Sequence, residues 1–267
     1  MSGQALTPPV RRRNHGRGHS YYDAEGRKVP GVTTIIGSGS PKEALIGWAA
    51  NTTASYAVDH WDELSEMKPS QRLKALQGAR YADRDAAANR GTAVHTLAER
   101  LVHGEEVQVP EELAGHVESY VRFLDEWDVQ PVAVEFVVVS YAFGWAGTGD
   151  LIASLLDPER PGERVTWGLD IKTSRSGIFG EVAWQCAGYF LGADAMLVDD
   201  AEQPIPACDR YGAVHVRADG YDLFPLDVGP QQLRELRYIR EVAAAVENAK
   251  EYVGEPLRPP VRQEANK

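Results

Sequence analysis

Three consecutive stretches of the chain are dense in apolar and β-branched residues, and each carries one acidic residue in its interior. The stretches cover residues 132–140, 144–156 and 164–173. Their composition predicts strands, and the short connections between them predict an antiparallel meander. The acids are Glu135, Asp150 and Asp170. A carboxylate inside an apolar strand is costly unless it is paired, so three of them on consecutive strands indicate a convergent carboxylate cluster.

Carboxylate clusters bind hard divalent cations through their oxygen atoms. Lys172 strengthens this interpretation, because residues two apart on a strand share a face and its side chain therefore projects beside Asp170. A lysine there can orient or deprotonate a water molecule and offset charge on a phosphate. For each acid alone, the simpler alternative is a salt bridge or an edge position. Asp170 with Lys172 alone would be an ordinary ion pair.

The remaining segments alternate between helical and extended patterns. Ser40, Pro41 and Glu43 predict a capped helix start, and Ser70 is a candidate cap for a second helix. Helices are expected over residues 40–60, from 70 onward, around 94–101 after Arg90-Gly91, and over 111–127, 178–191 and 231–253. Extended segments are expected over residues 21–29, 32–36, 211–216 and 221–226. This order predicts an α/β fold with a mixed central β-sheet flanked by helices and an N-terminal helical elaboration.

Composition limits the class of protein. The chain has 267 residues, of which 43% are hydrophobic, enough for a sizeable core. No apolar run approaches the ~20 residues that cross a bilayer, so no membrane role is expected. The N-terminus lacks the apolar region of a signal peptide, and Cys186 and Cys208 cannot build a disulfide framework or a four-thiolate iron–sulfur cluster. We therefore expect a cytoplasmic protein.

The charge distribution is uneven. The net charge of −11 argues against a general nucleic-acid binder, because phosphate contacts need lysine and arginine. Arginines nevertheless crowd the N-terminus at Arg11, Arg12, Arg13 and Arg17. Residues 1–18 are expected to be a disordered basic arm, with phosphate binding as the less favoured alternative. Residues 256–267 are expected to be a flexible tail.

Four short motifs follow one another along the chain. They are His19-x-Tyr21 with Val29–Ile35, then Arg90–His95, then Gly149-Asp150 with Asp170-Ile171-Lys172, and finally Gln185-Cys186-Ala187-Gly188-Tyr189. Together they resemble the RecB-like branch of the PD-(D/E)XK nuclease superfamily over roughly residues 19–230. The resemblance implies a restriction-endonuclease-like core in one nuclease domain, residues 19–255. Its helical part would cover about 40–128, its catalytic sheet about 132–227 and its closing helix about 229–253.

The resemblance also implies a metal centre. Asp150 and Asp170 would be the main ligands of Mg²⁺ or Mn²⁺, joined by the backbone carbonyl of Ile171 and by His95. Glu135 matches a strand acid that in some members binds a second metal or orients water. Read alone, His95 is more simply a satisfied core histidine. The family's cluster-bearing subgroup has a cysteine set that this chain lacks, so no iron–sulfur cluster is expected.

Other matched residues would handle water and DNA. Lys172 would position and activate the water, Gln185 would steady Lys172 or the backbone beside it, and Tyr189 would approach a DNA phosphate, with core packing as its alternative. Candidate strand-gripping residues are Arg90, Thr173, Ser174 and Arg175.

The implied activity is metal-dependent hydrolysis of DNA phosphodiester bonds that leaves a 5′-phosphate. A DNA-end-processing exonuclease of phage recombination or replication fits best, acting on double- or single-stranded ends in the cytoplasm, which is the host's if the chain is phage-encoded. A single-strand annealing protein or a helicase would accompany it. The alternatives are an endonuclease of the same fold, a nuclease-like module that binds DNA or protein without cutting, and a non-haem iron oxygenase. The oxygenase usually needs two histidines, and no ligand spacing links His215 to His95.

Overall fold

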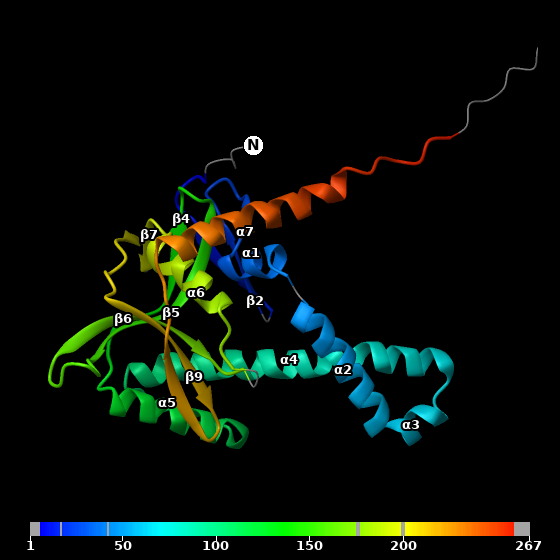
Figure 1. Ribbon diagram of the computed structural model, residues 1–267, viewed down its shortest axis with the longest axis horizontal. Helices are drawn as coiled ribbons and strands as arrows, with labels where there is room; N and C mark the ends of the chain where they lie inside the picture. The colour runs from blue at the N-terminus through cyan, green and yellow to red at the C-terminus, as the bar shows by residue number, and fades with distance from the viewer. Residues whose placement is uncertain (1–5, 17, 42, 175–176, 199–200, 259–267) are drawn as a thin grey trace, which may run out of the picture.

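The protein is an α/β structure with a seven-stranded mixed sheet flanked by helices (Figure 1). The computed structural model describes residues 6–258 except 17, 42, 175–176 and 199–200. The strands are β1 (Arg11–His15), β2 (Gly18–Tyr22), β3 (Lys28–Val29), β4 (Gln130–Ser140), β5 (Trp145–Leu156), β6 (Arg164–Lys172), β7 (Ala195–Val198), β8 (Ala201–Gln203), β9 (Arg210–Arg217) and β10 (Gly220–Pro225). The helices are α1 (Val32–Gly39), α2 (Glu43–Asp59), α3 (Trp61–Glu66), α4 (Pro69–Val102), α5 (Ala114–Glu126), α6 (Glu181–Cys186) and α7 (Pro230–Asn248), with short turns η1 (Glu111–Leu113), η2 (Ala187–Leu191) and η3 (Ala249–Glu251).

The large sheet has the strand order β10-β9-β6-β5-β4-β7-β8. The predicted antiparallel meander is confirmed as β4, β5 and β6, and the hairpin of β9 and β10 joins it through a parallel pairing of β9 with β6. The strands β7 and β8 were not anticipated, because they are short and lack an alternating pattern. The meander brings the three acid-bearing strands side by side.

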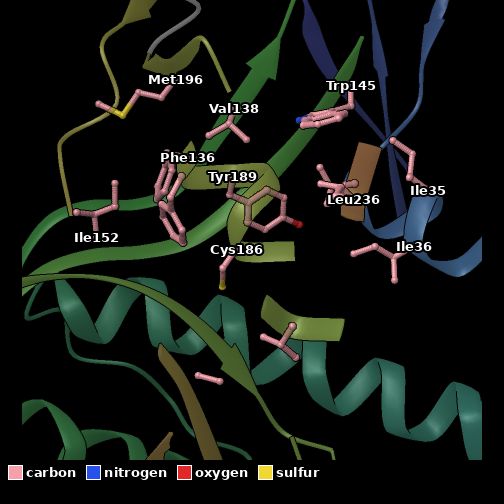
Figure 2. Packing of buried hydrophobic residues seen from close by; sticks show 14 residues of the cluster. Ile35, Ile36, Phe136, Val138, Trp145, Ile152, Cys186, Tyr189, Met196 and Leu236 are labelled. Atoms are coloured by element: carbon pink, nitrogen blue, oxygen red, sulfur yellow. The ribbon is translucent and has the colours of Figure 1, made fainter. Parts of the chain in front are cut away.

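Helices cover both faces of this sheet. On one face, α1, α6, η2 and α7 enclose a core that includes Ile35, Phe136, Trp145 and Leu236 (Figure 2). On the other face, α4 and α5 pack through Ala98, Tyr120 and Phe123 against apolar residues of β5, β6 and β9. Each face of a central strand is therefore buried, which explains why these strands are nearly continuous apolar runs.

A second, three-stranded sheet of β1, β2 and β3 lies at the N-terminus. The extended segment expected over residues 21–29 is a hairpin, in which β2 pairs with β3. The prediction of a disordered arm is wrong for the described part of residues 1–18, because Arg11–His15 forms a strand that pairs with Gly18–Tyr22. Gly16, at φ 51°, allows the tight connection, and the fully buried Val10 anchors its start. This sheet joins β5 through the hydrogen bond from Ala146 N to Pro30 O.

The segment 32–36 is helical as part of α1, although an extended conformation was predicted. Val32, Ile35 and Ile36 are β-branched, but they are also spaced i, i+3, i+4 and are all buried in the core. Tertiary burial of that face outweighs the local β propensity of these residues.

The N-terminal helical part is organised differently from the expectation. The helix α4 is a single 34-residue helix that passes through Gly91 without interruption and begins with Pro69 after Lys68, so Ser70 is not its cap. Ser40 Oγ donates to Ile36 O and closes α1, while Lys42 and the side chain of Glu43 lie outside the described residues. With α2 and α3, the first half of α4 forms an arm that extends away from the sheet (Figure 1).

The C-terminal region matches the predicted closing helix closely. The helix α7 ends at Asn248, η3 follows it, and residues 256–258 have no regular structure, while the rest of the expected tail lies outside the described residues. Among the helices that the structure describes, none has the length and apolar character to span a bilayer.

Candidate metal centre

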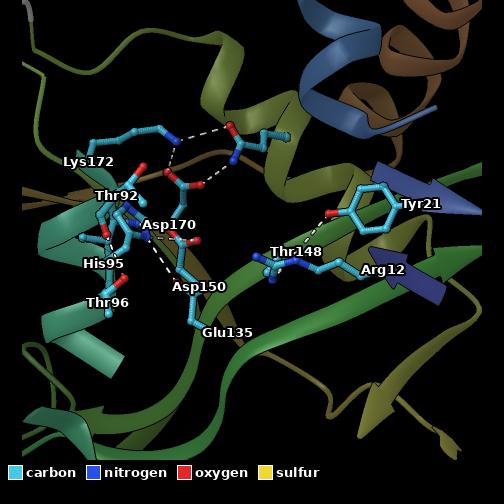
Figure 3. A network of polar contacts seen from close by, with 12 residues as sticks. Arg12, Tyr21, Thr92, His95, Thr96, Glu135, Thr148, Asp150, Asp170 and Lys172 are labelled. Atoms are coloured by element: carbon cyan, nitrogen blue, oxygen red, sulfur yellow. Dashed lines mark hydrogen bonds and ion pairs between the residues drawn. The ribbon is translucent and has the colours of Figure 1, made fainter. Parts of the chain in front are cut away.

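Three side chains from three different elements converge on one point. His95 comes from α4, Glu135 from β4 and Asp150 from β5 (Figure 3). Each offers one ligand atom, and these atoms all lie within 4.8 Å of one another. His95 Nδ1 is 3.3 Å from Glu135 Oε1 and 3.7 Å from Asp150 Oδ1. The strands and the helix on one face of the sheet therefore bring a nitrogen and two carboxylates together.

The β4–β5 register explains why the two carboxylates meet. Val134 pairs with Leu151 and Phe136 with Gly149, so Glu135 and Asp150 lie opposite each other on the same face. Glu135 has a φ of 48°, in the left-handed region that a branched or long side chain seldom adopts. Backbone of this kind costs on the order of 1–3 kcal/mol and is found at functional sites.

Gly149 makes room behind Asp150. A Cβ atom at this position would lie 2.5 Å from the ring of Phe136, so no larger residue fits without displacing that ring. The glycine in the Gly149-Asp150 motif thus has a packing role, because it lets an aromatic side chain pass directly under the strand that carries the acid.

Asp170 belongs to a second group beside the first. Its carboxylate is 1% exposed, its Oδ2 lies 2.6 Å from Lys172 Nζ, and its Oδ1 accepts a 2.6 Å hydrogen bond from Gln185 Nε2. Gln185 Oε1 in turn accepts from Lys172 Nζ at 3.3 Å. Gln185 therefore holds both members of the ion pair, which agrees with the expectation that it steadies Lys172.

The backbone of Ile171 connects the two groups. Its N–H donates to Asp150 Oδ2 at 2.6 Å, and its carbonyl oxygen accepts from His95 Nε2 at 3.0 Å. Asp170 itself is not among the three residues whose ligand atoms cluster, whereas Glu135 is. From the sequence, Asp170 was expected to be a main metal ligand and Glu135 a secondary one. The distances instead place Glu135 with His95 and Asp150 as a candidate ligand.

Several ionisable side chains lie close together in the centre and are buried away from water. Burial opposes the charged form of His95, but the carboxylates of Asp150 and Glu135 outweigh it and raise the pKa of His95 to about 9. Burial also raises the pKa of Asp170 to about 6, although Lys172 works in the opposite direction. For Lys172, burial is opposed by Asp170 and Asp150, and the pKa is raised. The histidine and the lysine thus carry the positive charge that balances the acids, and His95 would have to lose its proton to act as a metal ligand.

A divalent cation fits this donor set. Oxygen and imidazole nitrogen are the atoms that Mg²⁺ and Mn²⁺ accept. Ligand atoms on opposite sides of Mg²⁺ are about 4.2 Å apart, since each bond is about 2.1 Å, so a group within 4.8 Å needs only small adjustments. Asp170 Oδ2 is buried and accepts no well-aligned hydrogen bond from any residue described, its contact with Lys172 being an ion pair. His95, Glu135 and Asp150 would hold the ion, with Asp170 beside it, while the Ile171 carbonyl contacts the other ring nitrogen of His95.

The centre opens into a cavity of about 1260 Å³. One wall is the α4 segment from Asn89 to Glu99, and the other is the face of the small N-terminal sheet. His95, Glu135, Asp150 and Lys172 lie between these walls. Glu99, one turn after His95 on α4, lines the cavity and does not bond the His95 ring, since Glu135, Asp150 and Ile171 occupy both ring nitrogens.

The predicted strand-gripping residues are not gathered in this cavity. Ser174 Oγ donates to Gly177 O within its own loop, and neither Arg90 nor Thr173 is among the residues that line the cavity. Arg175 lies outside the described residues. Tyr189 is 3% exposed and belongs to the hydrophobic core, although it also borders the cavity, so core packing describes it better than an exposed phosphate contact. Cys186 is fully buried in the same core.

Four further residues lie beside the centre. The sequence motifs include His19 and Tyr21 without a role, Arg12 was expected only within the basic arm, and Thr148 was not singled out. Tyr21 Oη and Thr148 Oγ1 share a 2.8 Å hydrogen bond, Tyr21 Oη also bonds His19 Nε2 at 2.9 Å, and Arg12 Nη1 donates to Thr148 Oγ1 at 3.4 Å. The His19-x-Tyr21 motif was the available signal, because residues two apart on a strand share a face. Nothing local pairs that motif with Thr148.

No family model matches this sequence, and no curated protein matches it significantly. The resemblance described above therefore stays a prediction.

Proposed function

We propose that this protein is a metal-dependent nuclease that hydrolyses phosphodiester bonds in DNA, and that it acts as an exonuclease at DNA ends. The observation that carries the proposal is the placement of His95, Glu135 and Asp150 within ligand distance of one another, beside the Asp170–Lys172 pair, on the floor of a large cavity. Structural salt bridges alone do not require acids from two strands to meet a histidine at a cavity, beside an ion pair on a third strand.

The chemistry follows from the donor set. A divalent cation, when bound, supplies charge that stabilises the negative oxygens of the phosphate under attack. Lys172 Nζ, held by Asp170 and Gln185, is placed to donate to the attacking water and orient its lone pair. The water oxygen forms a bond to phosphorus, the bond from phosphorus to the 3′ oxygen breaks, and the 3′ oxygen leaves and takes a proton from solvent, so the products are a 3′-hydroxyl end and a 5′-phosphate end. The proton lost by the water passes to solvent.

The rigidity of the ion pair supports this role for Lys172. Its ammonium group has two oxygen partners, on Asp170 and Gln185, and both partners are fixed on a central strand and on α6. A lysine held in this way does not lose rotamer freedom when substrate binds, which lowers the entropic barrier to the reaction.

The decisive experiment is incubation of the protein with linear and circular DNA, single- and double-stranded, in Mg²⁺, Mn²⁺ or EDTA. We expect metal-dependent loss of the linear forms only. Loss of circular DNA as well would assign an endonuclease, and no cleavage of any substrate by the wild type would refute the nuclease.

Two variants test the assignment of residues. Lys172→Met is expected to reduce kcat by at least about 100-fold, because general acid–base and electrostatic groups contribute about 10²–10⁴. Lys74→Met removes the same group from an exposed position on α4 and should cut like the wild type. Equal activities of the two variants would remove Lys172 from the mechanism.

A further inference from the structure

One face of the small N-terminal sheet forms a wall of the cavity. In the register of β1 and β2, Arg12 lies opposite Tyr21 and Asn14 lies opposite His19, so these four side chains share a face. All four line the cavity. Arg11 alternates with them on the same strand, points to the opposite face and does not line the cavity.

This face is tied directly to the strand that carries Asp150. Arg12 Nη1 and Tyr21 Oη both contact Thr148 Oγ1, and Thr148 stands two residues before Asp150 on β5. Two residues of a strand advance about 7 Å along one face. In Figure 3 the Arg12 side chain points toward Thr148 beside the carboxylates. The guanidinium is therefore close to the metal centre but separate from it.

No carboxylate of the described part of the chain neutralises the charge of Arg12. Its hydrogen-bond partners are the neutral oxygens of Asn14, at 3.2 Å, and Thr148. Among the described residues, no carboxylate pairs with Arg12, whereas Arg160, Arg164 and Arg217 all form ion pairs. Arg12 therefore presents a positive charge on the cavity wall of a chain whose net charge is −11.

The bonds that Arg12 does make orient it. Asn14 accepts from Nε and Thr148 accepts from Nη1, so the side chain is directed across the cavity wall. A guanidinium presents a planar fork of donors that matches two oxygens of a phosphate. The Arg12 guanidinium lies on the wall of a cavity that has carboxylates at its floor. It is oriented by two hydrogen bonds and has no acidic partner among the described residues, so it is suited to bind an anion that enters with the substrate.

We propose that Arg12 is a phosphate clamp: it binds a phosphodiester next to the scissile one in the strand whose backbone passes the metal centre. Asn14 and Thr148 hold its guanidinium, and Tyr21 holds Thr148. The substrate class is a polynucleotide strand, since a clamp set apart from the centre needs a second phosphate. The identity of this strand as DNA rests on the proposed nuclease function.

Binding can be measured without cleavage. We would titrate the full chain, in EDTA, against fluorescein-labelled oligodeoxythymidylate and follow anisotropy at several salt concentrations. For Arg12→Ala we expect Kd to rise about tenfold, as for a lost hydrogen bond to a charged group. The slope of log Kd against log salt should fall by about 0.7, the value for one phosphate contact on a single strand.

Arg11→Ala is the matched control, because it removes the same charge from the same strand but from the opposite face. We expect it to bind like the wild type. Arg12→Lys keeps the charge and loses the fork, so its slope should equal that of the wild type while its Kd lies between those of the wild type and Arg12→Ala. Thermal unfolding of each variant would verify that the sheet is folded.

Equal Kd and slope for Arg12→Ala and Arg11→Ala, or no binding by the wild type, would overturn the clamp. Cleavage assayed in parallel with Mn²⁺ keeps the two proposals apart. A wild type that binds through Arg12 and cuts nothing refutes the nuclease and supports the clamp. A wild type that cuts, while the two alanine variants bind alike, refutes the clamp alone.

Discussion

Glu135 and Asp150 face each other across β4 and β5, and Glu135 reaches this position with a left-handed backbone at φ 48°. Glycine adopts such a φ without strain, whereas alanine does not. We therefore expect Glu135→Gly to be more stable than Glu135→Ala by about 1 kcal/mol, with metal affinity reduced in both. Urea unfolding of the metal-free variants measures the difference.

A control at a regular position of the same strand should show the reverse order. Val137 lies on β4, pairs with Thr148 and Leu197, and is not among the residues of positive φ. Val137→Gly should be less stable than Val137→Ala by about 0.5–1 kcal/mol, since glycine weakens ordinary strand backbone. If glycine is the worse replacement at both sites, the strain at Glu135 is not real.

Binding of a cation to the centre should stabilise the fold. At a free Mn²⁺ concentration about 100 times Kd, the free energy of unfolding should rise by about 2.7 kcal/mol, because the folded state alone carries the site. His95→Ala should abolish this rise, whereas His103→Ala, at an exposed position just after α4, should retain it. A full rise in His95→Ala would place the bound ion elsewhere.

Two glycine-to-alanine substitutions should change the stability of the fold in opposite directions. Gly149→Ala is expected to lose about 1–3 kcal/mol, because its Cβ would meet the Phe136 ring at 2.5 Å in a filled core. Gly37→Ala, in α1, has open space around its Cβ and should gain about 0.5–1 kcal/mol from helix propensity. Thermal denaturation of the two variants checks both signs, and a stable Gly149→Ala would contradict the packing described behind Asp150.

The hairpin of β2 and β3 should weaken in acid. Asp23 accepts from the side chain and the backbone of Arg27, and although burial opposes them, these bonds lower the pKa of Asp23. A lowered pKa in the folded state means that the stabilisation is present above the unfolded pKa of about 3.9 and is lost as the pH falls through the folded value. Asp23→Asn should thus be less stable than the wild type at neutral pH.

The difference between Asp23→Asn and the wild type should begin to shrink below about pH 4, where Asp23 becomes protonated in the unfolded state, and should be smallest once the pH lies below the lowered pKa of the folded state. Asp59→Asn, at the exposed end of α2, is the control and should follow the wild type at every pH. Urea unfolding at a series of pH values supplies the comparison. A difference in the free energy of unfolding that does not depend on pH would mean that Asp23→Asn destabilises the hairpin through the shape of its side chain and not through the loss of charge.

The sheet and its acids could be predicted because their signals are local. Apolar runs interrupted by Glu135, Asp150 and Asp170 identify strands and mark the unusual residues within them, and short connections make neighbours of consecutive strands. The α/β class followed from this order. The helix at Val32–Gly39 could not be predicted in the same way, because its β-branched residues favour a strand until the core that buries them is known.

The division of labour among the acids also needed three-dimensional structure. Asp170 and Lys172 are two apart in sequence, yet Gln185 and the burial around them decide that Asp170 remains paired with the lysine. The contribution of Arg12 depends on a contact with Thr148, far along the chain, which no spacing rule anticipates. Local sequence patterns reveal which charged residues are energetically costly to bury, and long-range packing decides which of them come into contact.

The centre draws on α4, β4, β5, β6 and α6, and this has a consequence for how the protein is made. These elements follow one another along the chain, so His95 is synthesised well before Lys172 and Gln185. Closing such distant contacts is entropically slow and completes late in folding. A growing chain that has produced α4 and β4 alone holds only His95 and Glu135 of the group. Competence to bind the cation is thus expected to arise together with completion of the sheet, so an unfinished chain lacks an assembled centre.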